Sequence, residues 1–171
     1  MTAGPRTVLF LCTGNSARSI LAESILRKLG SDRFDARSAG SAPRGEVHPM
    51  ALRALERHGC PTDGLSSKSW DDFAGPDAAE IDIIITVCDN AAGEVCPVWP
   101  GHPASAHWGL DDPAAASGTD ADIERAFNAA FQALYARIAL LTQLHVESLS
   151  RLALRTRLAA IHAAGGASSE A

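Results

Sequence analysis

An apolar run leads into a short polar loop, and a helical pattern follows the loop at once. The run covers residues 7–11, the loop reads CTGNS over residues 12–16, and apolar residues then recur at helical spacing as far as Gly30. This order predicts a buried strand, a loop and a helix. Such a loop directs backbone N–H groups into one concavity, where the helix dipole adds positive potential. We therefore expect an anion-binding loop here.

The alternation of strand and helix patterns continues along the chain. We expect further strands and helices over these residues: strands at 34–38, 81–87 and 104–108, and helices at 49–58, at 119–144 and beyond 148. The order predicts an α/β fold in which a parallel sheet of about four strands carries helices on both faces. We expect one domain over residues 1–145 and a helical extension with a flexible tail over residues 146–171.

Composition restricts the class of function. The chain has 171 residues, 46% of them hydrophobic, with a formal net charge of −5. Its length fits one domain, and its charge argues against nucleic acid or a membrane surface as a partner. The first apolar run is too short for a signal peptide or a membrane span, so we expect a cytoplasmic protein. In that compartment we expect the four cysteines to be reactive or buried thiols, and not parts of structural disulfides or structural zinc sites. They are Cys12, Cys60, Cys88 and Cys96.

The first loop carries the groups of a thiol nucleophile site. Cys12 lies beside the loop amides and Arg18, an environment that lowers the pKa of a thiol. The planar guanidinium of Arg18 can hold two oxygens of a tetrahedral oxyanion while the amides hold the others. The expected oxyanion-binding residues are Thr13, Gly14, Asn15, Ser16, Ala17, Arg18 and Ser19.

Four motifs resemble a known family. CTGNSARS is similar to the phosphate-binding loop of the low-molecular-weight protein tyrosine phosphatase fold, and specifically to that of the thiol-dependent arsenate reductases that share this fold. ARSAG, VCDNAAGEVCP and AHWGLDDPA follow in the family's order, so the resemblance extends over residues 6–143. It implies that Asp112 is the acid that protonates the leaving group, with Asp111 as the alternative. It implies no cofactor.

The resemblance also implies a relay of three thiols. In that scheme Cys12 attacks arsenate, Cys88 attacks Cys12 with release of arsenite, and Cys96 attacks Cys88 so that an external reductant reaches the disulfide. Seven residues separate Cys88 from Cys96, whereas thioredoxin-linked relatives usually have six. We favour thioredoxin as the reductant, with glutaredoxin or a small thiol as alternatives. Cys60 matches no role in the family.

Two other functions stay open. The same loop can hold phosphate, so a low-molecular-weight phosphatase is the nearest alternative. Phosphatases of this fold carry tyrosines directly after the Asp-Pro pair, whereas three alanines follow Pro113 and Tyr135 is the only tyrosine of the chain. A non-catalytic oxyanion or redox sensor is less favoured because nucleophile, arginine and acid are all present. The sequence leaves both a monomer and a homodimer open.

Residues beneath the loop differ from those of relatives that bind potassium there. Asn15, Glu23 and Ser38 match the ligand positions, but Lys68 takes the place of the expected acidic residue. An ammonium group can replace the cation. We therefore predict that Glu23, Ser38 and Lys68 support the loop, with no metal site and no potassium requirement.

Overall fold

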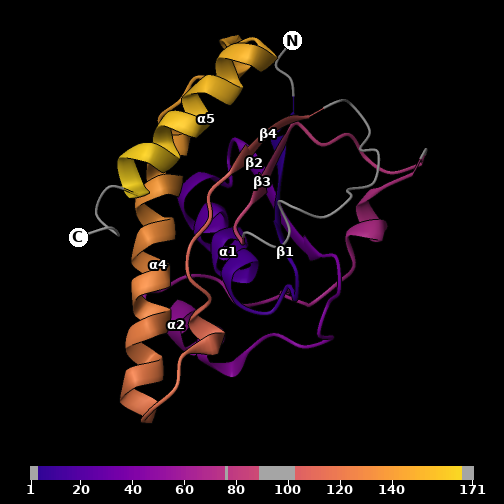
Figure 1. The fold of residues 1–171 in the computed structure, drawn as a ribbon. Coiled ribbons are helices and arrows are strands. Elements are labelled where there is room, and N and C mark those ends of the chain that lie inside the picture. Colours follow the sequence, from indigo (N-terminus) through magenta and orange to yellow (C-terminus); the bar gives the residue numbers. More distant parts are fainter. Residues whose placement is uncertain (1–3, 76, 89–102, 167–171) are drawn as a thin grey trace.

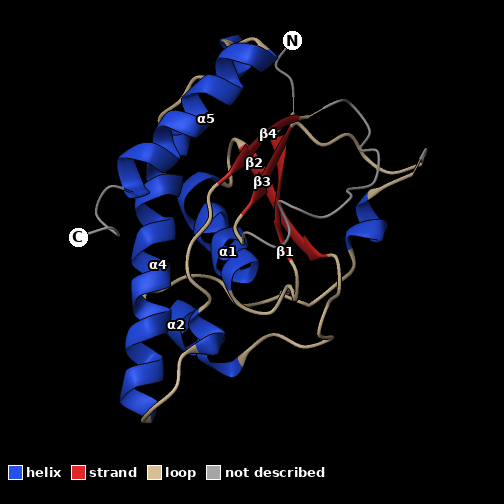
Figure 2. Cartoon of the chain, viewed as in Figure 1, coloured by secondary structure: helices blue, strands red, loops and turns tan. Residues whose placement is uncertain are grey.

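A parallel sheet with the strand order β2-β1-β3-β4 forms the centre of the protein (Figures 1 and 2). The computed structural model describes residues 4–75, 77–88 and 103–166. The strands are β1 (Arg6–Cys12), β2 (Phe34–Gly40), β3 (Ile83–Thr86) and β4 (Ala104–His107). The predicted α/β fold with a four-stranded parallel sheet is confirmed. Because all strands run the same way, β1 and β3 deliver their two cysteines, Cys12 and Cys88, to the same edge.

The helices begin where the sequence supplies a cap or a proline. α4 (Asp120–Thr142) starts at a capping box in which the Thr119 hydroxyl accepts the Asp122 N–H and the Asp122 carboxylate accepts the Thr119 N–H. α2 (Pro49–Arg57) starts at its proline. α1 (Arg18–Gly30) has no side-chain cap among the described residues, so its first amides remain available to the loop before it. None of the described helices combines the length and apolar character that a membrane crossing needs.

Alternate residues of β1 pack into two different hydrophobic cores, one on each face of the sheet. Val8 and Phe10 pack into the main core, which the sheet shares with the α-helices. Leu9 and Leu11 point to the opposite face, where the 3₁₀ helix η1 (Trp70–Phe73) covers them. Among the described residues, the α-helices thus cover one face and η1 covers the other (Figure 2). Full burial of each of these apolar side chains stabilises the fold by about 1.5–3 kcal/mol.

Beyond α4 the chain packs back onto the domain through η3 (Val146–Ser148) and α5 (Arg151–Gly166) (Figure 1). Leu158 of α5 is fully buried in the main core. Its carbonyl accepts the indole N–H of the fully buried Trp108 at 2.9 Å. The predicted extension is therefore helical and packs against β4 and α4. The domain boundary at residue 145 stays a prediction, and residues 167–171 lie outside the described part.

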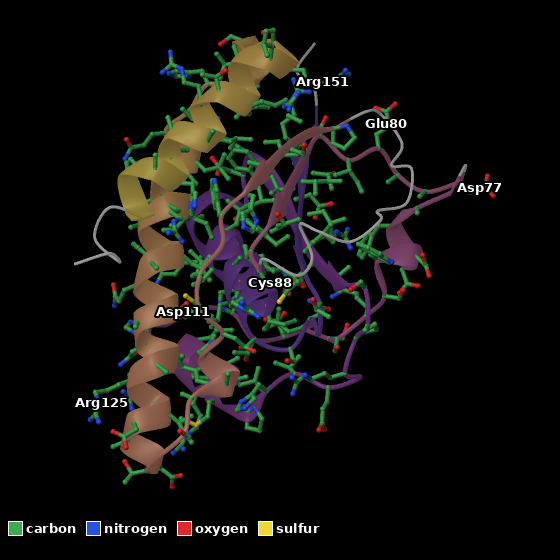
Figure 3. The ribbon with its side chains drawn as sticks, viewed as in Figure 1. Asp77, Glu80, Cys88, Asp111, Arg125 and Arg151 are labelled. Carbon is green, nitrogen blue, oxygen red and sulfur yellow. The ribbon has the colours of Figure 1, made fainter. Side chains whose placement is uncertain are left out.

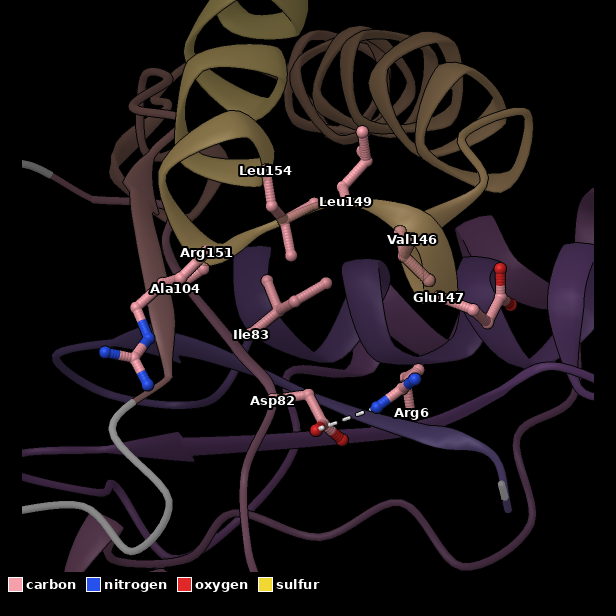
Figure 4. A pocket seen from close by; sticks show the side chains of 9 residues that line it. All are labelled: Arg6, Asp82, Ile83, Ala104, Val146, Glu147, Leu149, Arg151 and Leu154. Carbon is pink, nitrogen blue, oxygen red and sulfur yellow. Dashed lines mark ion pairs between the residues drawn. The ribbon is translucent and has the colours of Figure 1, made fainter. Parts of the chain in front are cut away.

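A cavity of about 210 Å³ lies where η3 and α5 meet the amino ends of the strands (Figure 4). Arg6 and Asp82 form an ion pair beside it, with 3.7 Å between nitrogen and oxygen. The Asp82 carboxylate also accepts the Thr7 N–H at 2.8 Å, and regular strand pairing of β3 starts only after this residue. Among the described residues that line this cavity there is no cysteine. Cys12 and Cys88 lie at the opposite edge of the sheet, where β1 and β3 end.

Candidate functional site

The loop between β1 and α1 turns its carbonyl groups away from the sheet edge. Three loop carbonyls accept hydrogen bonds from backbone N–H groups of residues 42–48. The pairs are Thr13 with Ala42 (2.9 Å), Gly14 with Arg44 (3.0 Å) and Ser16 with His48 (2.9 Å). In a trans peptide the N–H points opposite to the C=O, so the N–H groups that follow these carbonyls point inward. The loop thus presents the amides of Gly14, Asn15 and Ala17 to one concavity.

Asn15 fixes the shape of this loop. Its φ is +44°, in the left-handed region that asparagine tolerates better than most residues, and its side chain is fully buried. The side-chain amide donates to Ser19 Oγ at 2.8 Å and to Ser38 Oγ at 3.0 Å. The side-chain oxygen accepts the Lys68 N–H at 2.9 Å. The turn is therefore held by three different segments of the chain.

A buried carboxylate lies beneath the loop. Glu23 is 1% exposed, accepts the hydroxyl of Ser38 and forms an ion pair with Arg27. The ammonium of Lys68 lies 3.8 Å from Glu23 and donates to the Ser66 carbonyl at 2.7 Å. Burial lowers the pKa of Lys68, and Glu23 opposes this effect. The structure thus brings together the three residues from which loop support was predicted.

A cavity of about 330 Å³ opens above the loop. The residues that line it are Cys12, Thr13, Gly14, Ser16, Ala17, Arg18, Ala42, Arg44 and Asp112. Asn15 and Ser19, which were predicted among the oxyanion-binding residues, do not line it, because their side chains bond to each other inside the loop. Asn15 still directs its backbone N–H inward.

Arg18 and Asp112 face each other across this cavity. Arg18 donates to the Leu110 carbonyl at 2.9 Å and lies 3.6 Å from the Asp112 carboxylate. Its Nε is buried and has no hydrogen-bond partner among the described residues. The other carboxylate oxygen of Asp112 accepts the Ala114 N–H at 3.0 Å. Asp111 is exposed and does not line the cavity, so the geometry favours Asp112 over Asp111.

Two thiols meet at the base of the site. Cys12 and Cys88 are both buried and unbridged. Figure 3 shows Cys88 at the edge of the sheet and Asp111 on the loop beside α4. The Thr13 N–H donates to Cys88 Sγ at 3.3 Å, and the Thr13 hydroxyl lies 3.6 Å from the same sulfur. The sulfur of Cys88 therefore lies against the loop that begins at Cys12.

The pKa of Cys12 departs from the prediction. The hydrogen bond with Cys88 and then burial raise the pKa of Cys12, against the lowering effects of Arg18 and the Gly14 N–H. The predicted lowering is therefore wrong for this arrangement, because a second thiol lies against the first. Interacting thiols titrate as a pair, so a thiolate on one of them makes a second thiolate beside it costly.

Residues 7–152 match the family of low molecular weight phosphotyrosine protein phosphatases. This chain belongs to that family. An arsenate reductase from Bacillus licheniformis is 40% identical over 116 residues, which is 67% of this chain and 79% of that protein. A solved arsenate reductase in the phosphate binding state is 25% identical, with a TM-score of 0.62 over 85% of this chain and 99% of that one.

A thioredoxin-dependent arsenate reductase from Corynebacterium glutamicum is also similar. Its solved structure is 25% identical, with a TM-score of 0.54 over 82% of this chain and 65% of that one. Among the thiols of the predicted relay, Cys96 lies outside the described residues, so its place in the site stays a prediction. Cys60 is buried and is not among the described residues that line the cavity.

Two residues of the cavity were not predicted from the sequence. Ala42 and Arg44 come from the segment SAPRG, which follows β2 and precedes α2. Loops at the carboxyl ends of parallel strands are where ligands bind in α/β folds. An arginine in such a loop, one strand away from the nucleophile loop, was the signal that could have identified Arg44.

Proposed function

We propose that this protein reduces arsenate to arsenite through a thiol–disulfide relay. The observation that carries the proposal is the second thiol: the sulfur of Cys88 lies against the anion-binding loop, where it accepts the N–H of Thr13, the residue that follows Cys12, at 3.3 Å. A phosphatase needs one nucleophilic thiol, whereas a reductase needs a second thiol that can attack the first. The relatives named arsenate reductase support the same conclusion.

In the first step Cys12 attacks the arsenic(V) centre. An As–S bond forms, the bond from arsenic to one of its hydroxyl groups breaks, and that hydroxyl leaves as water after it receives one proton. We assign the proton to the carboxyl of Asp112, which lines the same cavity. Arg18 and the inward amides hold the remaining oxygens, and the unpartnered Nε of Arg18 supplies one further donor.

In the second step Cys88 attacks the sulfur of Cys12. The As–S bond breaks and its electron pair stays on arsenic, which leaves as arsenite, while the two sulfurs form a disulfide. Two electrons thus pass from two thiols to one arsenic atom. The sulfur of Cys12 carries no negative charge once it is bound to arsenic. A thiolate on Cys88 is then no longer repelled by a thiolate on Cys12. The Thr13 N–H then stabilises the attacking Cys88 thiolate.

In the last step we propose that Cys96 attacks Cys88, so that Cys12 returns to its thiolate form and a Cys88–Cys96 disulfide remains. A dithiol protein then reduces this disulfide. We favour thioredoxin because a similar protein is described as thioredoxin-dependent. Glutaredoxin or a small thiol is the alternative.

The lining of the cavity favours a small oxyanion over an aryl phosphate. None of the described residues that line it is aromatic, so a phosphotyrosine ring has no aromatic wall to pack against there. A volume of about 330 Å³ accommodates a tetrahedral anion with room to spare. Phosphate, which has the same shape and charge, is expected to compete with arsenate.

The test is arsenite formation from arsenate with the thioredoxin system present. Cys12→Ser and Cys88→Ser are expected to abolish turnover, and Cys60→Ser, which removes a buried thiol outside the cavity, is the matched control that keeps it. Glutaredoxin and small thiols are tested in parallel to identify the reductant. Absence of reduction with every reductant, together with hydrolysis of an aryl phosphate that depends on Cys12, would make the protein a phosphatase.

A further inference from the structure

Arg44 is a charged residue of the cavity that the steps above do not use. Among the described residues, three charged side chains line the cavity: Arg18, Arg44 and Asp112. The charge of Arg18 is partly balanced by Asp112 at 3.6 Å. Arg44 forms no ion pair with any described residue, so it carries the uncompensated positive charge at the cavity.

The backbone of Arg44 is fixed to the nucleophile loop although its side chain is exposed. Its N–H donates to the Gly14 carbonyl at 3.0 Å. The hydroxyl of Ser67 donates to the same carbonyl at 3.1 Å and accepts the Gly45 N–H at 3.1 Å. The backbone at Arg44 is therefore fixed relative to the nucleophile loop, which limits the positions open to its side chain.

The side chain of Arg44 lies over Gly14. A Cβ added at Gly14 would lie 3.1 Å from Arg44 Nε and 3.3 Å from Arg44 Cγ. The absence of a side chain at position 14 thus leaves space for the arginine to cross the loop toward the mouth of the cavity. Its guanidinium reaches this mouth from the side of β2, whereas Arg18 lines the cavity from the first turn of α1.

We propose that Arg44 is a second oxyanion-binding residue, which holds the doubly charged form of the tetrahedral anion from the mouth of the cavity. This inference deepens the proposed function and rests on it for the identity of the anion, but it applies equally to phosphate. Charge-assisted hydrogen bonds donated by arginine are stronger than hydrogen bonds between neutral groups. Solvent screening weakens the attraction between the guanidinium and the anion where the side chain is exposed. Because Arg44 lies away from the reacting sulfur, it acts on binding more than on the chemical step.

The test combines a binding readout with kinetics. Inorganic phosphate is titrated to protect Cys12 from alkylation by iodoacetamide, and the labelled peptide is followed by mass spectrometry. Arg44→Ala is expected to raise the half-protecting phosphate concentration and the KM for arsenate by roughly three- to tenfold, with kcat within about twofold. For Arg44→Lys, which keeps the charge, both quantities should lie between those of the unchanged protein and those of Arg44→Ala. Arg53→Ala removes an exposed arginine of α2 outside the cavity and is the control.

The outcomes separate this inference from the proposed function. A shift in phosphate protection in a protein that does not reduce arsenate would support Arg44 as an anion ligand and reject the reductase. Unchanged phosphate protection in Arg44→Ala would overturn the inference. So would an increase in the KM for the reductant with no change in the KM for arsenate, because Arg44 would then contact the reductant and not the anion.

Discussion

Replacement of Asn15 tests how the loop keeps the shape on which every proposed step depends. Asn15 combines a φ of +44° with a fully buried side chain. Its side chain makes three hydrogen bonds, to Ser19, to Ser38 and to the N–H of Lys68. Asn15→Ala removes all three and leaves an alanine in a left-handed conformation, whereas Asn15→Gly removes the same bonds without the conformational cost.

The magnitude follows from these contacts. A buried hydrogen bond contributes about 1 kcal/mol net, so the three bonds together contribute about 3 kcal/mol. The left-handed conformation costs an alanine about 1 kcal/mol more than it costs an asparagine or a glycine. We therefore expect Asn15→Ala to lower the free energy of unfolding by about 4 kcal/mol and Asn15→Gly by about 3 kcal/mol. Because the inward amides lose their fixed positions, phosphate affinity is expected to fall at least about tenfold in both variants.

Urea unfolding followed by circular dichroism measures both changes. Ser41→Ala is the control, because the Ser41 hydroxyl is buried in a neighbouring loop and has no hydrogen-bond partner among the described residues. This control should leave the free energy of unfolding nearly unchanged. A loss below about 1 kcal/mol for Asn15→Ala, or a glycine variant less stable than the alanine variant, would refute the reasoning.

Three further predictions concern the pair of thiols, the packing of the loop and the last helix. Cys88→Ala removes the main cause that raises the pKa of Cys12, so the pH midpoint of Cys12 alkylation should fall, and an unchanged or higher midpoint would contradict the coupling. A Cβ at Gly40 would lie 2.4 Å from the Thr13 carbonyl oxygen, so Gly40→Ala should destabilise the protein by about 1–3 kcal/mol in urea unfolding and weaken phosphate protection. Trp108→Phe keeps the buried ring but loses the indole hydrogen bond to α5, and its expected loss of about 1 kcal/mol in thermal unfolding would be absent if α5 were not docked.

The elements that the sequence predicted well are those with local signals. The apolar run of residues 7–11 predicted β1, and the helical spacing of apolar residues after the loop predicted α1. Both patterns lie within a single segment of the chain, so they can be read without knowing the tertiary structure. The helix predicted over residues 119–144 is α4, which the structure starts at Asp120 after a capping box of Thr119 and Asp122. The end of β4 was predicted one residue too late, at Trp108, whereas the strand ends at His107. The Trp108 N–H nevertheless donates to the Thr86 carbonyl at 2.7 Å.

The features of the site that could not be predicted from the sequence depend on contacts between distant segments. The raised pKa of Cys12 comes from Cys88, which reaches the loop from a strand 75 residues beyond Thr13. Arg44 lines the cavity from a distant loop, whose backbone is joined to the nucleophile loop by the hydrogen bond from the Arg44 N–H to the Gly14 carbonyl. The direction of the Asn15 side chain, beneath the loop and not into the cavity, depends in the same way on distant segments. None of these contacts has a periodic signal in the sequence.

The central claim is that Cys12 and Cys88 together supply the two electrons that reduce one arsenate to arsenite. A single-turnover experiment on Cys96→Ser tests it most directly, with arsenite and the disulfide both quantified and the bridge located by mass spectrometry. The account predicts one Cys12–Cys88 disulfide for each arsenite released, and no further turnover. Arsenite release without that bridge, or a reduced Cys88 after full exposure to arsenate, would contradict it.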